Sequence, residues 1–176
     1  MKIATIFTLS IISFQAFCVD NYIEEQIKKL SSHDKEIRKD GAHRLDSYWT
    51  SNGAKTDPKE IDKYITELKN SLKDPESAVV QFITHIMGAN PMVDQKTNEV
   101  YYYVNRTTPE IRKSIINIMV ENLSSKDAWI SSRSASTLIN SSQCEYETQI
   151  RDRIALSTSF KFMFKEQLKK LNDLCK

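Results

Sequence analysis

This sequence contains few glycines and prolines and has no large surplus of either charge. Its 176 residues include 3 glycines and 4 prolines against 40% hydrophobic residues, which disfavours a turn-rich β-sandwich and a disordered chain. Its 25 basic and 23 acidic residues nearly balance, whereas a nucleic-acid-binding surface normally needs a basic surplus on one face. We therefore expect one domain with a buried core and no nucleic-acid partner.

The sequence also lacks the short motifs that accompany common catalytic and cofactor chemistries. It has no glycine-rich phosphate loop, no His-Glu-x-x-His motif, no Cys-x-x-Cys pair and no G-x-S-x-G element. The adjacent acids Glu24 and Glu25 point to different helix faces, so they do not form a catalytic pair. We predict no catalytic residue, no metal site and no cofactor.

The first residues have the composition of a secretory signal peptide. Lys2 supplies one positive charge, and residues 3–17 form an apolar run without charges that is shorter than the ~20 residues of a typical membrane span. Ala16 and Cys18 satisfy the small-x-small rule for cleavage. The sequence therefore predicts a signal peptide over residues 1–18.

Two alternatives to cleavage stay open at this terminus. Cys18 is the residue that a lipoprotein signal would modify, but such signals favour a small residue before the cysteine and Phe17 is bulky. The other alternative is an uncleaved anchor. We expect a periplasmic or secreted protein, with one domain over residues 19–176 and no stable membrane insertion after cleavage.

An apolar pattern recurs three times along the chain. A leucine is followed seven residues later by a β-branched residue, here called position +0, and then by small or apolar residues at +4 and +8. The three instances are Leu30, Ile37, Gly41 and Leu45; Leu72, Val79, Ile83 and Met87; and Leu123, Ile130, Ser134 and Leu138. In each, one helix ends at a polar turn and a second helix buries the three positions. Self-similarity of this kind is typical of solenoids.

Capping residues and apolar stripes divide the chain into four helical hairpins. Asp57-Pro58, Asp74-Pro75 and Thr108-Pro109 each place an N-cap residue before a proline at the first helical position. The predicted pairs are 21–30 with 34–49, 58–72 with 75–87, 109–123 with 127–139, and 145–156 with 160–174. The stripes are Ile61, Ile65, Leu68 and Leu72; Ile111, Ile115, Met119 and Leu123; and Phe160, Phe164, Leu168 and Leu171.

The recurring pattern resembles that of the HEAT-repeat family. The shared pattern is a leucine, then Val or Ile followed by Arg, with a small residue four or five places on. The best match is formed by Ile37, Arg38, Gly41, Ala42 and Leu45. The resemblance covers roughly residues 21–140 and departs where Ile83 is large and where Val80 and Ser131 replace the arginine. It implies an all-α, short right-handed solenoid of about four hairpins that acts as a binding scaffold.

Two predicted positions in each second helix lie opposite the buried edge. Positions +2 and +6 point roughly away from +0, +4 and +8 on a helical wheel. They are Lys39 and His43, Gln81 and His85, and Ser132 and Ser136. Similarity to HEAT solenoids implies that they line the inner surface and contact a partner protein. The alternative is a solvated polar ridge without a partner.

A long connection near residues 90–106 separates the second and third hairpins. Residues 92–104 have β-rich ends around a polar centre, which predicts an irregular segment or a small β-hairpin. Tyr101, Tyr102 and Tyr103 lie in its second half, and tyrosines supply contact area at low entropic cost. We predict a partner-binding loop. The alternative is that alternate tyrosines pack against the edge of the domain.

The remaining cysteines predict a terminal disulfide. If Cys18 leaves with the signal peptide, Cys144 and Cys175 form an even pair in an oxidising compartment. Cys144 precedes the last predicted hairpin and Cys175 ends it, and antiparallel helices bring those two ends together. The predicted bond stabilises the last hairpin, which packs against one neighbouring hairpin where an internal one has two. The alternative is a pair of free thiols.

Three functional hypotheses follow from the sequence. The favoured one is an exported, monomeric scaffold without catalysis, which binds another protein of unknown identity through the solenoid surface and the tyrosine loop. A specific alternative is an immunity-type inhibitor that neutralises a toxin or hydrolase in the periplasm, motivated by small size and export. An enzyme whose site is assembled only by the tertiary structure is the third.

Overall fold

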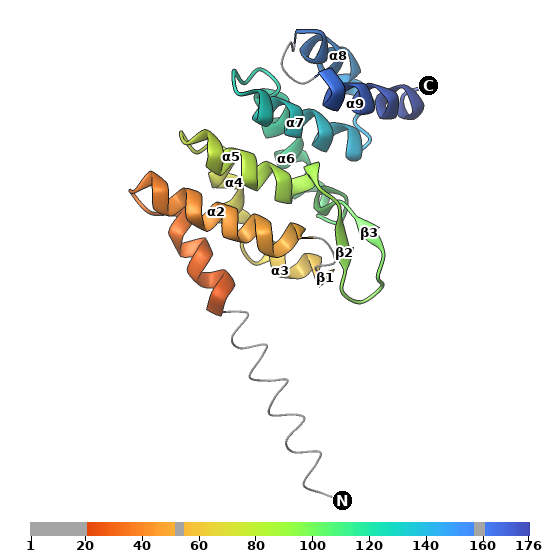
Figure 1. Cartoon of the computed structure of the whole chain (residues 1–176). Helices are drawn as coiled ribbons and strands as arrows, with labels where there is room; N and C mark the ends of the chain where they lie inside the picture. Colours follow the sequence, from red (N-terminus) through yellow and green to blue (C-terminus); the bar gives the residue numbers. More distant parts are fainter. Residues whose placement is uncertain (1–20, 52–54, 157–160) are drawn as a thin grey trace, which may run out of the picture.

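A computed structural model describes residues 21–51, 55–156 and 161–176 of the chain (Figure 1). The predicted signal peptide and its alternatives at Cys18 lie outside the described residues, as do Phe160 and the side chain of Phe164. Within the described ranges, no helix is long and apolar enough to cross a membrane.

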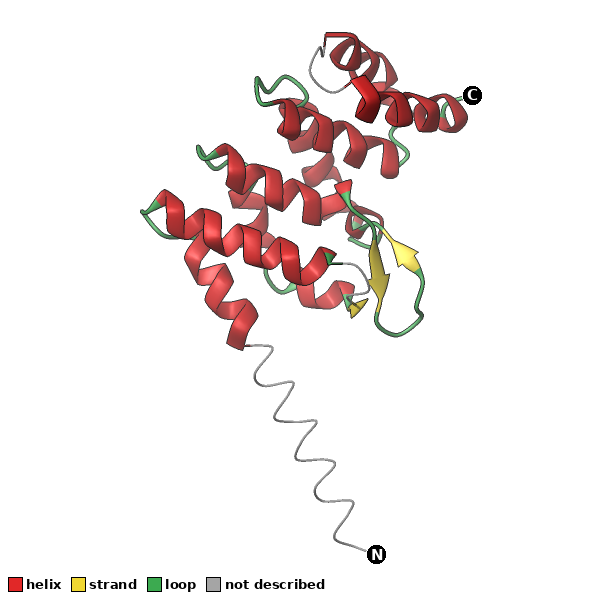
Figure 2. Ribbon diagram, viewed as in Figure 1, coloured by secondary structure: helices red, strands yellow, loops and turns green. Residues whose placement is uncertain are grey.

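The described residues are mostly helical, with a small three-stranded sheet at one edge of the molecule (Figure 2). A helix over residues 21–30 comes first. In chain order there follow α2 (Lys35–Thr50), β1 (Lys55–Thr56), α3 (Pro58–Asp62), α4 (Ile65–Ser71), α5 (Ser77–Thr84), the π-helix η1 (His85–Ala89), β2 (Met92–Asp94), β3 (Val100–Tyr101), the 3₁₀ helix η2 (Tyr103–Asn105), α6 (Pro109–Asn122), α7 (Ala128–Asn140), the 3₁₀ helix η3 (Cys144–Tyr146), α8 (Glu147–Leu156) and α9 (Lys161–Leu174).

The helices form consecutive pairs that contact one another in chain order. The second helices α2, α5 and α7 lie side by side, and α9 packs against α7 (Figure 1). Each of α5, α7 and α9 also packs against the first helix of its own pair, which is α4, α6 or α8. Residues far apart in the sequence are therefore joined mainly through neighbouring pairs.

The buried positions follow the recurring apolar pattern, with one exception. The residues predicted inside at +0, +4 and +8 are buried at Gly41 and Leu45, at Val79, Ile83 and Met87, and at Ile130, Ser134 and Leu138. Ile37 was also predicted inside, but 43% of it is exposed. Its equivalents Val79 and Ile130 belong to helices that have a preceding neighbour. In the described part of the chain, α2 has no second helix before it, because the helix over residues 21–30 is the first helix of its own pair.

One hydrogen-bond pattern recurs in the turns before α2, α5 and α7. The second residue after the pattern's leucine accepts the backbone N–H of the fourth, and the fourth is the N-cap of the next helix. The pairs are Ser32–Asp34 at 3.2 Å, Asp74–Glu76 at 2.8 Å and Ser125–Asp127 at 3.2 Å. Asp74 is the second residue after the leucine and not the N-cap, which is Glu76. The helix α5 therefore begins at Ser77, and the predicted start at Pro75 is wrong.

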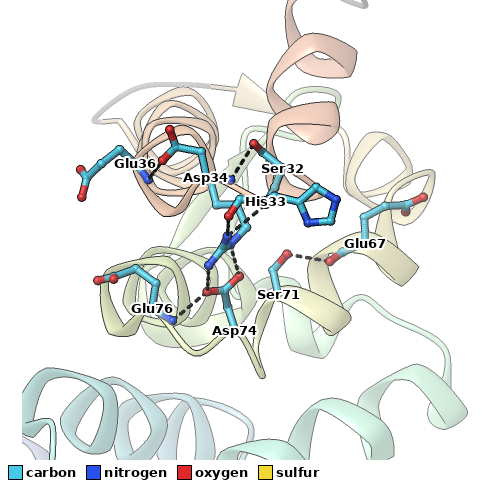
Figure 3. A network of polar contacts seen from close by, with 9 residues as sticks. Ser32, His33, Asp34, Glu36, Glu67, Ser71, Asp74 and Glu76 are labelled. Carbon is cyan, nitrogen blue, oxygen red and sulfur yellow. Dashed lines mark hydrogen bonds and ion pairs between the residues drawn. The ribbon is translucent and has the colours of Figure 1, made fainter.

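Arg38 ties the first of these turns to the second. Its Nε and Nη2 donate to the two carboxylate oxygens of Asp74 at 2.7 and 3.1 Å. Its Nη1 donates to the carbonyl oxygens of Ser32 and His33 at 3.0 and 3.2 Å. Figure 3 shows Ser32, His33 and Asp74 close together in this network. Since only 13% of the arginine side chain and 9% of the aspartate side chain are exposed, this ion pair is shielded from water.

The sheet forms in the connection that the sequence marks as irregular. β2 and β3 pair antiparallel, so the predicted β-hairpin is confirmed. β1, which the sequence analysis did not predict, pairs parallel with β2 through Lys55↔Val93 and Thr56↔Asp94. A second departure lies between β1 and β2, where the helix predicted over residues 58–72 is broken at Lys63 and Tyr64 into α3 and α4.

The terminal cysteines lie together as predicted. The sulfur atoms of Cys144 and Cys175 are 2.10 Å apart, a disulfide, and their Cα atoms are 5.5 Å apart. Cys144 opens η3 and Cys175 directly follows α9, so the bond closes the last helix pair on itself. A disulfide is compatible with an oxidising, extracellular compartment.

Candidate functional site

The predicted contact residues of α2 lie on the molecular surface. Lys39 and His43 are both exposed, and the Lys39 ammonium lies 3.7 Å from a carboxylate oxygen of Glu36. The His43 ring packs against the ring of Phe82 on α5, with centroids 5.0 Å apart. With Asp40, these four residues line a hollow of about 360 Å³ between the two helices.

The predicted contact residues of α5 and η1, Gln81 and His85, are partly exposed and link neighbouring helices. Gln81 donates from Nε2 to Asp127 Oδ2, at the start of α7, at 3.0 Å. His85 Nδ1 lies 2.7 Å from Oδ1 of Asp46 on α2, and this oxygen also accepts from the Thr50 hydroxyl at 3.1 Å. The side chain of Asp46 is 12% exposed. Both predicted residues therefore hold consecutive helix pairs together.

The predicted ridge is covered on α7. Ser132 is 1% exposed, and the Gln167 amide of α9 donates to its carbonyl oxygen at 3.2 Å and to the Ser136 hydroxyl. The fourth helix pair occupies the surface that we expected to be open at these two serines. The ridge of +2 and +6 residues is therefore limited to α2, α5 and η1.

A guanidinium and an indole that the sequence analysis missed lie on α7. Arg133 Nη1 donates to the carbonyl oxygen of Gln81 at 2.6 Å, and its guanidinium carbon lies 5.7 Å from the centre of the Trp129 ring. Trp129 is 41% exposed. Burial lowers the pKa of Arg133, against the opposing effect of the nearby carboxylates of Asp46 and Asp127.

Equivalent positions on the second helices point to the same neighbours. At +2, Gln81 and Ser132 bond to the following helix pair. At +3, Phe82 and Arg133 contact the preceding second helix. The sequence analysis did not consider position +3, although this position directly follows +2 in every instance of the pattern. It supplies two large side chains of this surface, Phe82 and Arg133.

The tyrosine loop is mostly buried, which corrects the prediction of a contact surface there. Tyr101 is 5% exposed and its hydroxyl donates to the Thr56 carbonyl oxygen at 3.2 Å. Tyr103 is fully buried and its hydroxyl donates to Asp62 Oδ1 at 2.7 Å. Burial raises the pKa of both phenols. Alternate tyrosines pack against the domain, and only Tyr102, which is partly exposed, stays available to a partner.

Among the described residues, the polar groups of this surface include one contact between a carboxylate and an imidazole. Asp46 and His85 resemble two members of a triad, but no described side chain bonds the other ring nitrogen of the histidine. Across the described ranges there is also no cluster of three or more His, Cys, Asp or Glu residues placed to hold a metal ion. Aromatic, cationic and hydrogen-bonding groups on one surface are instead suited to contact with another molecule.

Comparison with known proteins gives similarity of fold only. No protein-family model matches the chain, and no curated protein matches it. Three crystal structures of engineered proteins are similar, with 19%, 18% and 17% sequence identity and TM-scores of 0.54, 0.54 and 0.51. Each match covers 85% of this chain, but only 60%, 36% and 61% of the respective engineered protein. At these identities the likeness says nothing about function.

Proposed function

We propose that this protein is an exported, non-catalytic module that binds another protein through the exposed surface of α2, α5 and α7. This second-helix surface comprises Lys39, His43, Phe82, Trp129 and Arg133. Trp129 carries the proposal, because a large aromatic side chain 41% exposed beside a guanidinium is the combination enriched at binding hot spots. The His43–Phe82 contact extends the aromatic area on the neighbouring helices.

The scaffold that presents this surface is a short, right-handed, HEAT-like solenoid in our proposal. Two observations support it. The turns before α2, α5 and α7 repeat one hydrogen-bond pattern, and the +2 and +3 side chains contact neighbouring pairs in the same directions. In a solenoid, each unit contacts only its neighbours, and equivalent surface positions form a continuous binding face.

Export is the second part of the proposal. The Cys144–Cys175 disulfide supports it, because such bonds persist in oxidising compartments and are rare in the cytosol. Cell fractionation and N-terminal sequencing of the accumulated protein test it. We expect a mature chain that begins near residue 19, and a cytosolic chain that retains Met1 would contradict export.

Site-specific photo-crosslinking in the native host tests the binding surface. A benzophenone amino acid replaces His43 in one variant and Lys113, an exposed residue of α6, in the control. We expect a discrete protein adduct from position 43 and none from position 113. No adduct from position 43, or equal adducts from both positions, would contradict binding through the second-helix surface.

A further inference from the structure

Arg133 keeps hydrogen-bond donors that the folded chain does not use. Its Nη1 donates to the Gln81 carbonyl oxygen, while Nε and Nη2 have no acceptor among the described residues. Neither of these two nitrogens is fully buried, in contrast to Arg153 Nε, which is buried without an acceptor. In Arg38, the corresponding two nitrogens, Nε and Nη2, donate to both carboxylate oxygens of Asp74.

The charge of Arg133 has no carboxylate in contact. In the described part of the chain, no Asp or Glu oxygen lies within ion-pair distance of it, whereas Arg38, Arg44, Arg106 and Arg151 all have such a partner. Asp46 is engaged by His85, and Asp127 caps α7 and accepts from Gln81. A partly buried cation without a paired anion is costly, and an incoming carboxylate offsets that cost.

We propose that Arg133 receives a side-chain carboxylate from an acidic segment of the partner protein, with an adjacent apolar side chain packing on Trp129. The two carboxylate oxygens accept from Nε and Nη2, the bidentate arrangement that guanidinium groups favour. This inference rests on the proposed function, and it adds the chemistry that the second-helix surface recognises.

Charge favours a protein carboxylate over a nucleic-acid phosphate backbone. A phosphate backbone is held by several cations spread along its path. Here Glu36 and Asp40 line the hollow beside His43, and Asp46 and Asp127 lie near Arg133, so a polyanion that follows the surface would meet negative charges along its path. A single carboxylate beside an apolar group fits one guanidinium and one indole.

A random dodecapeptide phage library panned on the purified, oxidised protein tests this inference. We expect the selected peptides to share an Asp or Glu next to a large apolar residue. The best peptide is then synthesised, and its affinity is measured for wild type and for three variants: Arg133→Gln, Trp129→Ala and Arg112→Gln. Arg112 is the matched control, because it also donates to one backbone carbonyl, that of Ser141, but lies on α6.

We expect Arg133→Gln and Trp129→Ala each to weaken binding by at least about ten-fold, and Arg112→Gln to leave it unchanged. Replacing the peptide's acid by its amide should cost as much as Arg133→Gln, and the two changes together little more than either alone. Arg133→Lys keeps the charge but loses the two parallel donors of the guanidinium. Its affinity for the peptide should therefore lie between that of wild type and that of Arg133→Gln. Melting curves identify any variant that fails to fold.

The other outcomes separate this inference from the proposed function. Peptides that lack an acid, bind independently of Arg133 and are blocked by Trp129→Ala would overturn the carboxylate assignment and leave the binding surface standing. Displacement of the peptide by a single-stranded oligonucleotide at equal concentration would overturn it in favour of phosphate. Failure to select any peptide that is sensitive to Trp129→Ala would count against both proposals.

Discussion

Arginine serves two purposes in this molecule. The Arg38 guanidinium donates hydrogen bonds to both carboxylate oxygens of Asp74 and to two backbone carbonyls of the same chain. Arg133 uses a single donor on Gln81 and leaves its outer edge open. The first joins two helix pairs, and we propose that the second joins the protein to its partner. The two roles predict different consequences of mutation.

Arg38→Ala should lower the melting temperature by several degrees. It leaves the Asp74 carboxylate shielded from water without its counter-charge, and it frees two carbonyls in the first turn. Arg38→Lys should recover only part of the loss, because an ammonium cannot reproduce the fork. Arg44→Ala is the control, since its pair with Asp40 is exposed. Equal effects of Arg38→Ala and Arg44→Ala in thermal unfolding would contradict this role.

Gly41→Ala should destabilise the protein although alanine favours helices over glycine by about 1 kcal/mol. A β-carbon at Gly41 would lie 2.8 Å from the Gln26 carbonyl oxygen and 2.7 Å from the Lys29 β-carbon, so the helix over residues 21–30 must shift. Overpacking of this kind costs about 1–3 kcal/mol. Urea unfolding measures the change, and a more stable Gly41→Ala variant would show that the two helices are not in close contact.

Helical periodicity predicts part of the site at the residue scale. It places Lys39 and His43 outside and Leu45 inside, because those directions are fixed within one helix. It does not show which side of a helix meets a preceding pair, so the exposure of Ile37 and the contacts of Arg133 were missed. Both depend on a neighbour that is remote in sequence.

At the scale of elements, capping chemistry predicts the helix starts that local residues control. Asp57 and Thr108 cap α3 and α6 ahead of their prolines, as the sequence indicates. The break at Lys63 and Tyr64 has no glycine or proline to reveal it, and the apolar stripe runs on across it. β1 is two residues long and pairs with a strand beyond α5, so no local pattern could predict it.

The turn of the β-hairpin should give the protein a pH-dependent stability. Backbone N–H groups of Thr97 and Lys96 hold the pKa of Asp94 below its usual value. A pKa that is lower in the folded state contributes stability above the unfolded value near 4, and this is lost as the pH falls through the folded value. Asp94→Asn should therefore be less stable than wild type at pH 7.

Urea unfolding of both proteins at pH 7, 5, 4 and 3 measures this contribution. We expect the difference between wild type and Asp94→Asn to shrink below pH 5 and to be smallest at pH 3. The asparagine keeps an acceptor oxygen for the turn, so it removes the charge with little change of shape. A difference that stays constant across the series would mean that the carboxylate charge is not what stabilises the turn.

Reduction of the disulfide should loosen the last helix pair. Cys144 and Cys175 are separated by 31 residues, and closing a loop of that length stabilises a protein by about 3–4 kcal/mol in the loop-entropy model. Cys144→Ser with Cys175→Ser should lower the melting temperature and speed amide exchange in α8 and α9 first. Equal acceleration of exchange in α2 and α5 would show that the bond stabilises the whole domain rather than its end.

For the whole molecule, the sequence predicts the order of the helix pairs better than the surface they form. The recurring pattern and the caps indicate consecutive pairs, and these are present with a β-hairpin inserted after the second. Two of the three loop tyrosines point inward: Tyr101 and Tyr103 bury their rings, and their hydroxyls reach Thr56 and Asp62. The inhibitor and enzyme hypotheses stay predictions, since no comparison bears on activity.

Hydroxyl-radical footprinting of the protein with its crosslink-identified partner tests the central claim most directly. Trp129 and His43 lie exposed on the second-helix surface, and His33 is an exposed histidine in the first turn. We predict that partner binding lowers the oxidation of Trp129 and His43 several-fold and leaves His33 unchanged. Unchanged oxidation of Trp129 and His43 in the complex, with protection elsewhere, would contradict binding through α2, α5 and α7.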